Sequence, residues 1–307
     1  MNRITMLAAA AVLTVGILAT SGAGAPARAQ QPIDPAAFSP AITNPLYPLS
    51  LIGPKVFEGE DIDPDTGDVI ETRLESRVLP QTKVVAGVTV TVLEEKAFEE
   101  GEVVELALDY FAQHRDGSVY YFGEAVDNYE GGQLKDHHGQ WLAGEDGNQP
   151  GIIMPAQPVA GQTFEQELAP GVAEDKATVL ALNETVTVPA RNYTGCLKTR
   201  EFSPIEPGVE ELKWHCPGAG LVKEEGDGSL SELVSVAAAP AASPTTAPTP
   251  SSPTPRGVVA PNAGDGSGTG DAAGPPGWVI AVGVGALALA LGPVVIVRAA
   301  AARRLEG

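Results

Sequence analysis

The stretch VIETRLESRVLPQTKVVAGVTVTVLEE, residues 69–95, decides the fold class of this chain. In its first part, Ile70, Leu74 and Ser76 share one face of an extended chain, while glutamates and arginines occupy the other face. Its second part, residues 83–95, alternates in the same way but carries little charge on either face. A repeat of two residues is typical of β-strands, so we predict two strands here, separated by the turn-forming LPQT.

The same repeat continues along the globular part of the chain, where no segment keeps an apolar repeat of 3.6 residues. Turns such as EEGE, RDGS, YEGGQ and GEDG are too short for parallel crossovers and favour antiparallel hairpins. Further strands are predicted in EVVELALDYF (102–111), SVYYFGE (118–124), KDHHGQW (135–141), QTFEQEL (162–168), KATVLALNETVTV (176–188), GLVKEE (220–225) and LSELVSV (230–236), and in a hairpin around the two cysteines.

These features predict an all-β fold. We expect an antiparallel meander of about ten strands that forms an open or closed barrel or a sandwich, plus one C-terminal transmembrane helix. The repeat of two does not choose among these closures. Residues 30–236 are numerous enough for one large β domain or two small ones.

The N-terminus has the layout of a secretory signal peptide, residues 1–29. Arg3 precedes an apolar run that ends near Ala19, and Ala27-Arg28-Ala29 forms a small-x-small cleavage site. Gln30 is then the first mature residue. An uncleaved membrane anchor is the alternative interpretation of this run.

The C-terminal part of the chain predicts a membrane anchor. Residues 277–297 contain 21 residues without a charge, which is long enough for a helix to span the hydrocarbon core. The arginines of residues 298–307 indicate a cytoplasmic tail. Between globule and membrane, residues 237–276 are rich in Pro, Ala, Ser, Thr and Gly and predict an extended stalk. We therefore expect a single-pass protein of the cell membrane with its β domain, residues 30–236, outside the cytoplasm.

The charge of the globular segment limits its partners. Residues 30–236 hold 36 of the 39 acidic residues and 13 of the 19 basic residues, a formal charge of 13 minus 36, or −23. Nucleic acid and anionic lipid surfaces both repel such a protein, so we expect no nucleic-acid partner. The expected partners are the membrane, through the C-terminal helix, and an unidentified extracellular ligand or protein.

The two cysteines of the chain, Cys196 and Cys216, predict a disulfide bond. An exported chain folds where thiols can be oxidised. The turn signal SPIEPG lies midway between the two residues, so a hairpin around it would place them opposite each other. Two free thiols are the alternative.

Several segments resemble a family of uncharacterised secreted bacterial β-rich proteins. They are NPLYPL (44–49), YYFGE (120–124), WLAGEDGNQPGIIMPAQP (141–158), GQTFEQELAPGVAED (161–175) and EPGVEELKW (206–214). The resemblance covers most of residues 44–236 and implies one contiguous domain. Because the family has no established activity, the resemblance implies no functional residue.

Aromatic residues crowd into one third of the globular segment and are candidates for ligand binding. Core packing is the usual role of cross-strand aromatic pairs. At the mouth of a barrel, however, such residues form an apolar pocket with polar tips. The candidate ligand-binding residues are Tyr110, Tyr120, Tyr121, Phe122 and Trp141.

His137 and His138 in KDHHGQW are candidate metal ligands. Adjacent side chains of a strand point to opposite faces, so both could bind one ion only if the chain bulges at Gly139. Further ligands would have to come from His114, His215 or distant acids. Solvent-facing strand histidines are the alternative interpretation.

The chain lacks a coherent set of catalytic residues. There is no G-x-S-x-G motif, and Asp109 with Glu124 is only one of many carboxylate pairs that a glycosidase could use. Our main hypothesis is therefore a non-catalytic, membrane-tethered module that binds a ligand or partner at the cell surface, without a cofactor. The alternatives are an anchored hydrolase or metal-dependent enzyme using His137 and His138, and a structural envelope protein.

Overall fold

The computed structural model describes residues 33–64, 66–226 and 228–238. The predicted signal peptide, transmembrane helix and cytoplasmic tail lie outside these residues, as does the predicted stalk beyond Ala238. Within the three described ranges, no helix is both long and apolar enough to cross a membrane.

The described residues form sixteen strands and one short 3-10 helix. In chain order these are η1 (Pro35–Ala37), β1 (Phe38–Ser39), β2 (Lys55–Ile62), β3 (Val69–Val85), β4 (Val88–Glu99), β5 (Glu102–His114), β6 (Val119–Glu130), β7 (Gln133–Asp136), β8 (Trp141–Leu142), β9 (Gln149–Met154), β10 (Thr163–Glu165), β11 (Glu167–Leu168), β12 (Lys176–Val188), β13 (Arg191–Phe202), β14 (Glu210–Cys216), β15 (Gly220–Gly226) and β16 (Leu230–Val236).

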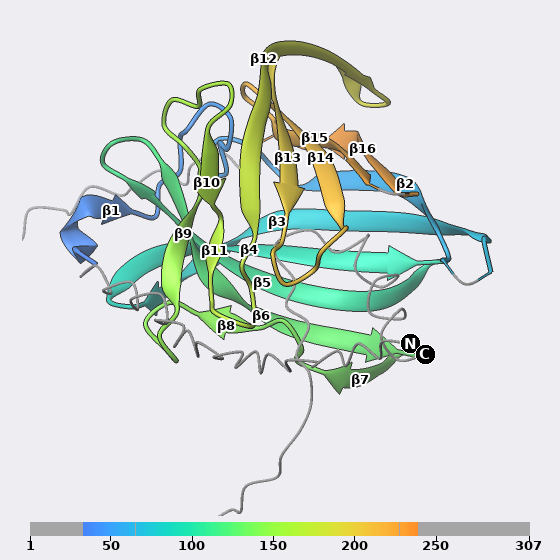
Figure 1. Ribbon diagram of the computed structural model, residues 1–307, viewed down its shortest axis with the longest axis horizontal. Helices are drawn as coiled ribbons and strands as arrows, with labels where there is room; N and C mark the ends of the chain where they lie inside the picture. Colours follow the sequence, from blue (N-terminus) through green and yellow to red (C-terminus); the bar gives the residue numbers. More distant parts are fainter. Residues whose placement is uncertain (1–32, 65, 227, 239–307) are drawn as a thin grey trace, which may run out of the picture. The chain divides into compact units, whose positions relative to one another are not determined.

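The sheet confirms the predicted antiparallel meander (Figure 1). Its strands follow the order β10-β12-β13-β14-β15-β16-β2-β3-β4-β5-β6-β9-β11. Most neighbours in this order are consecutive in the chain, as expected for strands joined by short turns. The pairing of β16 with β2 joins the C-terminal strands to the N-terminal ones, with Leu233 opposite Phe57.

The two ends of this order lie next to each other in the chain, so the sheet is a nearly closed barrel. Strand β10 pairs with β12 and strand β11 pairs with β9, and only Gln166 separates β10 from β11. The backbone amides of Gln166 and Glu167 both donate to the carbonyl oxygen of Asp175, at 2.8 and 3.2 Å. Gly151 on β9 lets the backbone of Gln166 lie directly against β9, because a Cβ at this position would meet the carbonyl oxygen of Gln166. Among the predicted closures, the structure therefore favours the barrel.

The opening stretch folds differently from its predicted division. The predicted single strand over residues 83–95 is wrong, because Ala86 and Gly87 form a tight turn between β3 and β4. Their φ angles of 48° and 81° suit a two-residue hairpin, whose left-handed turn matches the twist of the strands. The predicted turn at LPQT is also wrong, since β3 continues through it with a register shift between Val78 and Thr82.

Two apolar clusters form the core of the described residues. The first contains the stacked rings of Phe111 and Tyr121, whose centroids lie 4.7 Å apart, and Trp141, whose ring meets Tyr121 edge-on at 5.4 Å. The second contains Phe57 and Leu74 beside the cysteines. Burial of such side chains is the main favourable term in the folding of the sheet.

Candidate functional site

A cavity of about 60 Å³ lies inside the barrel. One wall comes from β2, β3 and β4, and the other comes from β13, β14 and β15. The segment from Tyr47 to Gly53 also lines it. A water molecule needs about 10–15 Å³ of such space, so the cavity has room for several waters or for a small organic molecule. Its charged or amide-bearing lining residues include Lys55, Glu95, Gln166, Glu201, Lys213 and His215.

Three polar residues form a row across the first wall. Lys55 on β2 lies opposite Ser76 on β3, and Ser76 lies opposite Glu95 on β4. Directly opposed residues of an antiparallel sheet present their side chains on the same face, with Cβ atoms about 5 Å apart. All three residues are buried and line the cavity. The strand register therefore brings an amine, a hydroxyl and a carboxyl group to one wall.

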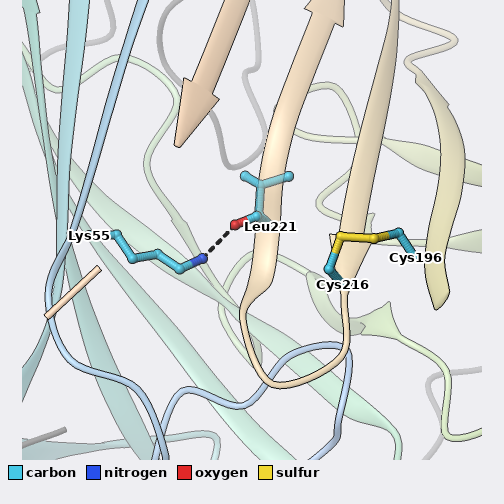
Figure 2. The surroundings of a disulfide bond; sticks show 4 residues. All are labelled: Lys55, Cys196, Cys216 and Leu221. Atoms are coloured by element: carbon cyan, nitrogen blue, oxygen red, sulfur yellow. Dashed lines mark hydrogen bonds between the residues drawn. A yellow bond between two sulfur atoms is a disulfide. The ribbon is translucent and has the colours of Figure 1, made fainter. Parts of the chain in front are cut away.

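The amine of Lys55 is held against the second wall (Figure 2). Its Nζ donates a hydrogen bond of 2.7 Å to the carbonyl oxygen of Leu221 on β15. The ring of Phe57 lies beside it, with the centroid 5.3 Å from Nζ. Burial disfavours the charged amine and lowers the pKa of Lys55 to about 8, although Glu95 and Glu224 oppose this shift.

Lys213 on β14 organises the second wall. Its Nζ lies 2.8 Å from Glu201, 3.2 Å from Glu211 and 3.3 Å from Glu224. Burial alone would lower the pKa of Lys213, but the three carboxylates outweigh burial and raise it well above its ordinary value. Burial likewise raises the pKa of Glu224 to about 8, with Lys213 opposing it. A buried lysine with several carboxylates requires this mutual neutralisation.

Two buried polar atoms face this cavity without a hydrogen-bond partner in the described part of the chain. They are Nδ1 of His215 and Oε1 of Gln166. Burial first, and then Lys213 and Lys55, lower the pKa of His215 to about 3, so its ring is neutral. Leaving a buried polar group unsatisfied costs about 1–3 kcal/mol. These two atoms are therefore places where a bound molecule or water gains a hydrogen bond.

A second buried polar group lies in the aromatic part of the interior. Asp109 on β5 is directly opposite Glu124 on β6, and Glu124 is opposite Trp141 on β8. The hydroxyl of Tyr121 donates to Asp109 at 2.7 Å. Burial raises the pKa of Tyr121 well above its ordinary value, and the charges of Asp109, Glu124 and Glu167 add to the effect. The structure thus brings together the carboxylate pair that the sequence singled out only weakly.

The five predicted ligand-binding aromatics lie in or against the apolar core. Tyr110, Tyr121, Phe122 and Trp141 are almost fully buried, and Tyr120 is partly buried. Tyr120 and Phe122 each pack edge-on against Phe38, with ring centroids 5.3 Å apart. None of the five is among the residues that line the cavity. Their role in binding a ligand stays a prediction.

The predicted metal-binding histidines lie at the surface rather than within a strand. Strand β7 ends at Asp136, so the expectation that residues 135–141 form one strand is wrong. Gly139, with φ of 91°, breaks the alternation, as shared coordination requires. His137 is exposed, and its Nδ1 lies 2.8 Å from Asp127. In the described ranges, no three His, Cys, Asp or Glu side chains are grouped so as to hold a metal ion.

The disulfide between Cys196 and Cys216 is confirmed (Figure 2). Strands β13 and β14 form the predicted hairpin, with Leu197 opposite His215. The two cysteine Cα atoms are 4.1 Å apart. The bridge therefore holds together two strands of the cavity's second wall, one residue away from His215.

The sequence interpretation missed Lys55, Gln166 and Lys213 as site residues. A signal was present in EELKWHC, where Lys213 and His215 alternate with Leu212 and Trp214. Alternation alone assigns such polar residues to the solvent face of a strand. Only the closure of the barrel turns this face inward, where both residues are buried.

Comparisons with known proteins give two structural similarities. A Bacteroides fragilis protein with a YmcC-like fold, provisionally described as exported, is 13% identical over 61% of this chain and 99% of its own, with a TM-score of 0.36. A Parabacteroides distasonis protein, provisionally described as a lipoprotein, is 12% identical over 62% of this chain and 98% of its own, with a TM-score of 0.33. No family model and no curated protein matches the chain. Similarity at this level supports no conclusion about function, and membership of the secreted family stays a prediction.

Proposed function

We propose that this chain is a non-catalytic, membrane-tethered module that binds one small molecule in the cavity of its extracytoplasmic barrel. The observation that carries the proposal is the pair of unpartnered buried atoms, His215 Nδ1 and Gln166 Oε1, in a cavity large enough for a ligand. Binding sites for small molecules typically combine apolar walls with a few convergent polar groups. Leu49, Ile52 and Phe57 supply apolar lining here.

The proposed location rests mainly on the sequence. The signal-like residues 1–29 and the uncharged residues 277–297 predict export and anchoring. The disulfide is consistent with an oxidising compartment, since such bonds persist outside the cytoplasm. The stalk would hold the binding domain away from the membrane surface.

The test is native mass spectrometry of the full chain, purified in a mild detergent from a bacterial host. We expect a co-purified small molecule at one per chain, absent from empty micelles. His215→Leu removes a polar atom from the cavity and should lower the occupancy at least several-fold. His137→Leu, at an exposed histidine outside the cavity, is the matched control and should keep it.

Other outcomes support the other hypotheses. Stoichiometric metal that is lost in a His137→Ala/His138→Ala variant would favour the anchored enzyme and contradict our proposal. A chain that binds neither a co-purified compound nor any member of a small-molecule library would favour a structural envelope component. Protease accessibility on intact cells tests the location separately, since a protected globular domain would contradict it.

A further inference from the structure

Lys55 has the surroundings of a nucleophilic lysine. Lys55 lines the cavity, its Nζ donates a hydrogen bond to Leu221, and its neighbours include the ring of Phe57. The apolar Leu49 and Ile52 line the same space. An amine in such surroundings loses its proton more easily than an exposed one, and the pKa of Lys55 is lowered to about 8. A neutral amine has a free electron pair with which it can attack an electrophile.

The groups beside Lys55 suit a reaction that moves a proton twice. Ser76 and Glu95 continue the row from Lys55 across β3 and β4, and both line the cavity. The charge of Glu95 acts on the titration of Lys55, which places the two groups within electrostatic reach. A carboxylate in this position can accept a proton from an attacking amine and return it to a departing hydroxyl group.

We propose that Lys55 binds small aldehydes or ketones covalently in the cavity, as an imine. The amine nitrogen attacks the carbonyl carbon, and a proton passes from nitrogen to oxygen to give a carbinolamine. Loss of water then forms the C=N bond, with no oxidant or reductant needed. The inference rests on the proposed function, because the carbonyl compound must first enter the same cavity. Arg77 lines the cavity with a side chain that is 58% exposed, so the cavity reaches the surface there.

The reaction should depend on the charge of Lys55 and of the groups that face it. The titratable groups that face Lys55 come from several strands. They are Glu95 on β4, Glu201 on β13, Lys213 and His215 on β14, Glu224 on β15, and Tyr47 in the segment before β2. At pH 7, the fraction of free amine should be on the order of a hundredfold larger at Lys55 than at an ordinary exposed lysine. At neutral pH, the amine of Lys55 should therefore react faster than the amines of the surface lysines.

The experiment treats the full chain at pH 7 with butanal and sodium cyanoborohydride. The reductant adds hydride to the imine carbon and leaves a stable butylamine that proteolysis and mass spectrometry can locate. We expect labelling at Lys55 at least tenfold faster than at Lys135, an exposed lysine. Free α-amines of peptides have a reference pKa near 8, so an added dipeptide such as glycylglycine serves as the standard for the labelling reaction.

Two variants control for the side chain itself. Lys55→Met should lose the label in the β2 peptide and keep the slow labelling of Lys135, while Lys135→Met should label at Lys55 like the parent chain. Tryptophan fluorescence on heating shows whether each variant is folded. If Lys55→Met does not fold, the peptide map of the parent chain still decides, because labelling at Lys55 no faster than at Lys135 overturns the inference.

Binding of 1-butanol separates this inference from the proposed function. The alcohol has the same carbon chain but forms no imine. If 1-butanol raises the melting temperature of the parent chain and butanal does not label Lys55, the covalent inference is wrong and the binding function stands. If neither compound binds and no other small molecule does, both proposals are wrong.

Discussion

Two parts of the barrel interior are built from antiparallel strands of one sheet but differ in content. One part is packed with aromatic rings, and the other holds charged groups around a cavity. Around β5, β6 and β8, the ring of Tyr121 packs against the rings of Phe111 and Trp141, and all three are buried. Between β2–β4 and β13–β15, charged groups surround a cavity, with Lys213 bound to three carboxylates. Figure 1 shows that both parts belong to one continuous sheet.

The difference shows that stability and binding capacity come from separate parts of this barrel. Stacked rings contribute burial and about 0.5–1.5 kcal/mol for each aromatic pair. The charged wall gains little net stability over apolar packing, because removing charges from water costs several kcal/mol per ion. What it supplies is a set of fixed polar groups around an unfilled space. Loss of one charged partner should therefore lower the free energy of unfolding more than loss of one hydrogen bond among the rings.

Replacing Lys213 should have the largest effect. Lys213→Met leaves Glu201, Glu211 and Glu224 without their shared cation, and breaking a buried ion pair in this way costs about 3–5 kcal/mol. Urea unfolding followed by tryptophan fluorescence measures the change. Lys198→Met is the control, because the amine of Lys198 lies over the ring of Trp214 and away from the cavity. Equal losses in the two variants would contradict the special contribution of the buried Lys213 ion pairs.

Removing the disulfide should cost about 3 kcal/mol. The bridge joins residues 20 positions apart, and releasing this loop gives the unfolded chain entropy that lowers its free energy by that amount. The variant Cys196→Ala/Cys216→Ala should therefore unfold at lower urea concentration. Because the bridge joins β13 and β14, which carry part of the cavity wall, ligand occupancy should fall as well. Equal stability of the oxidised and the reduced parent chain would contradict this contribution of the bond.

Tyr121→Phe tests the aromatic part and should cost about 1–2 kcal/mol. The substitution keeps the ring between Phe111 and Trp141 but removes the hydrogen bond to Asp109. Since none of these residues lines the cavity, ligand occupancy should not change. Thermal unfolding and native mass spectrometry give the two values. A fall in occupancy with little loss of stability would instead support the predicted binding role of the aromatics.

The last test is the pH dependence of stability, and its effect is confined to a narrow pH range. The folded-state pKa of Glu224 is raised from 4.5 to about 8, so between these values the folded chain binds more protons than the unfolded chain. Its contribution to stability is therefore present at low pH and lost as pH rises through about 8. Glu224→Gln should flatten the unfolding free energy between pH 6.5 and 8. Below pH 6.5, His215 acts in the opposite sense, because its pKa is lowered to about 3.

The strands that could be predicted are those in which side chains alternate by polarity. KATVLALNETVTV was predicted as a strand, and β12 has the same limits, Lys176–Val188. The hairpin around SPIEPG and the disulfide were also predicted, because turn residues and two cysteines define them locally. The division of residues 69–95 was wrong, since the left-handed turn at Ala86 and Gly87 left no gap in the apolar pattern.

The candidate site was not predictable in the same way. The side chains of Lys55, Glu95 and Lys213 would all be assigned to a solvent face from their charge alone. The histidines of KDHHGQW attracted attention because they are adjacent in sequence, but they lie at the surface, outside the cavity. Proximity in the chain therefore pointed to residues outside this cavity, and their role as metal ligands stays a prediction.

By itself, the sequence determined the strand period, the antiparallel order, the disulfide partners and the predicted membrane anchor. These properties depend on local repeats, short turns and composition. Only the tertiary structure decided which face of each strand lies inside, because Gln166 joins β10 to β11 and the first and last strands of the order thereby meet. The pairing of β16 with β2 places Lys55 near β15, and the curvature of the whole sheet places Glu201 in the same cavity as Glu95. Contacts between residues more than a hundred positions apart depend on the whole sheet, and no local pattern encodes them.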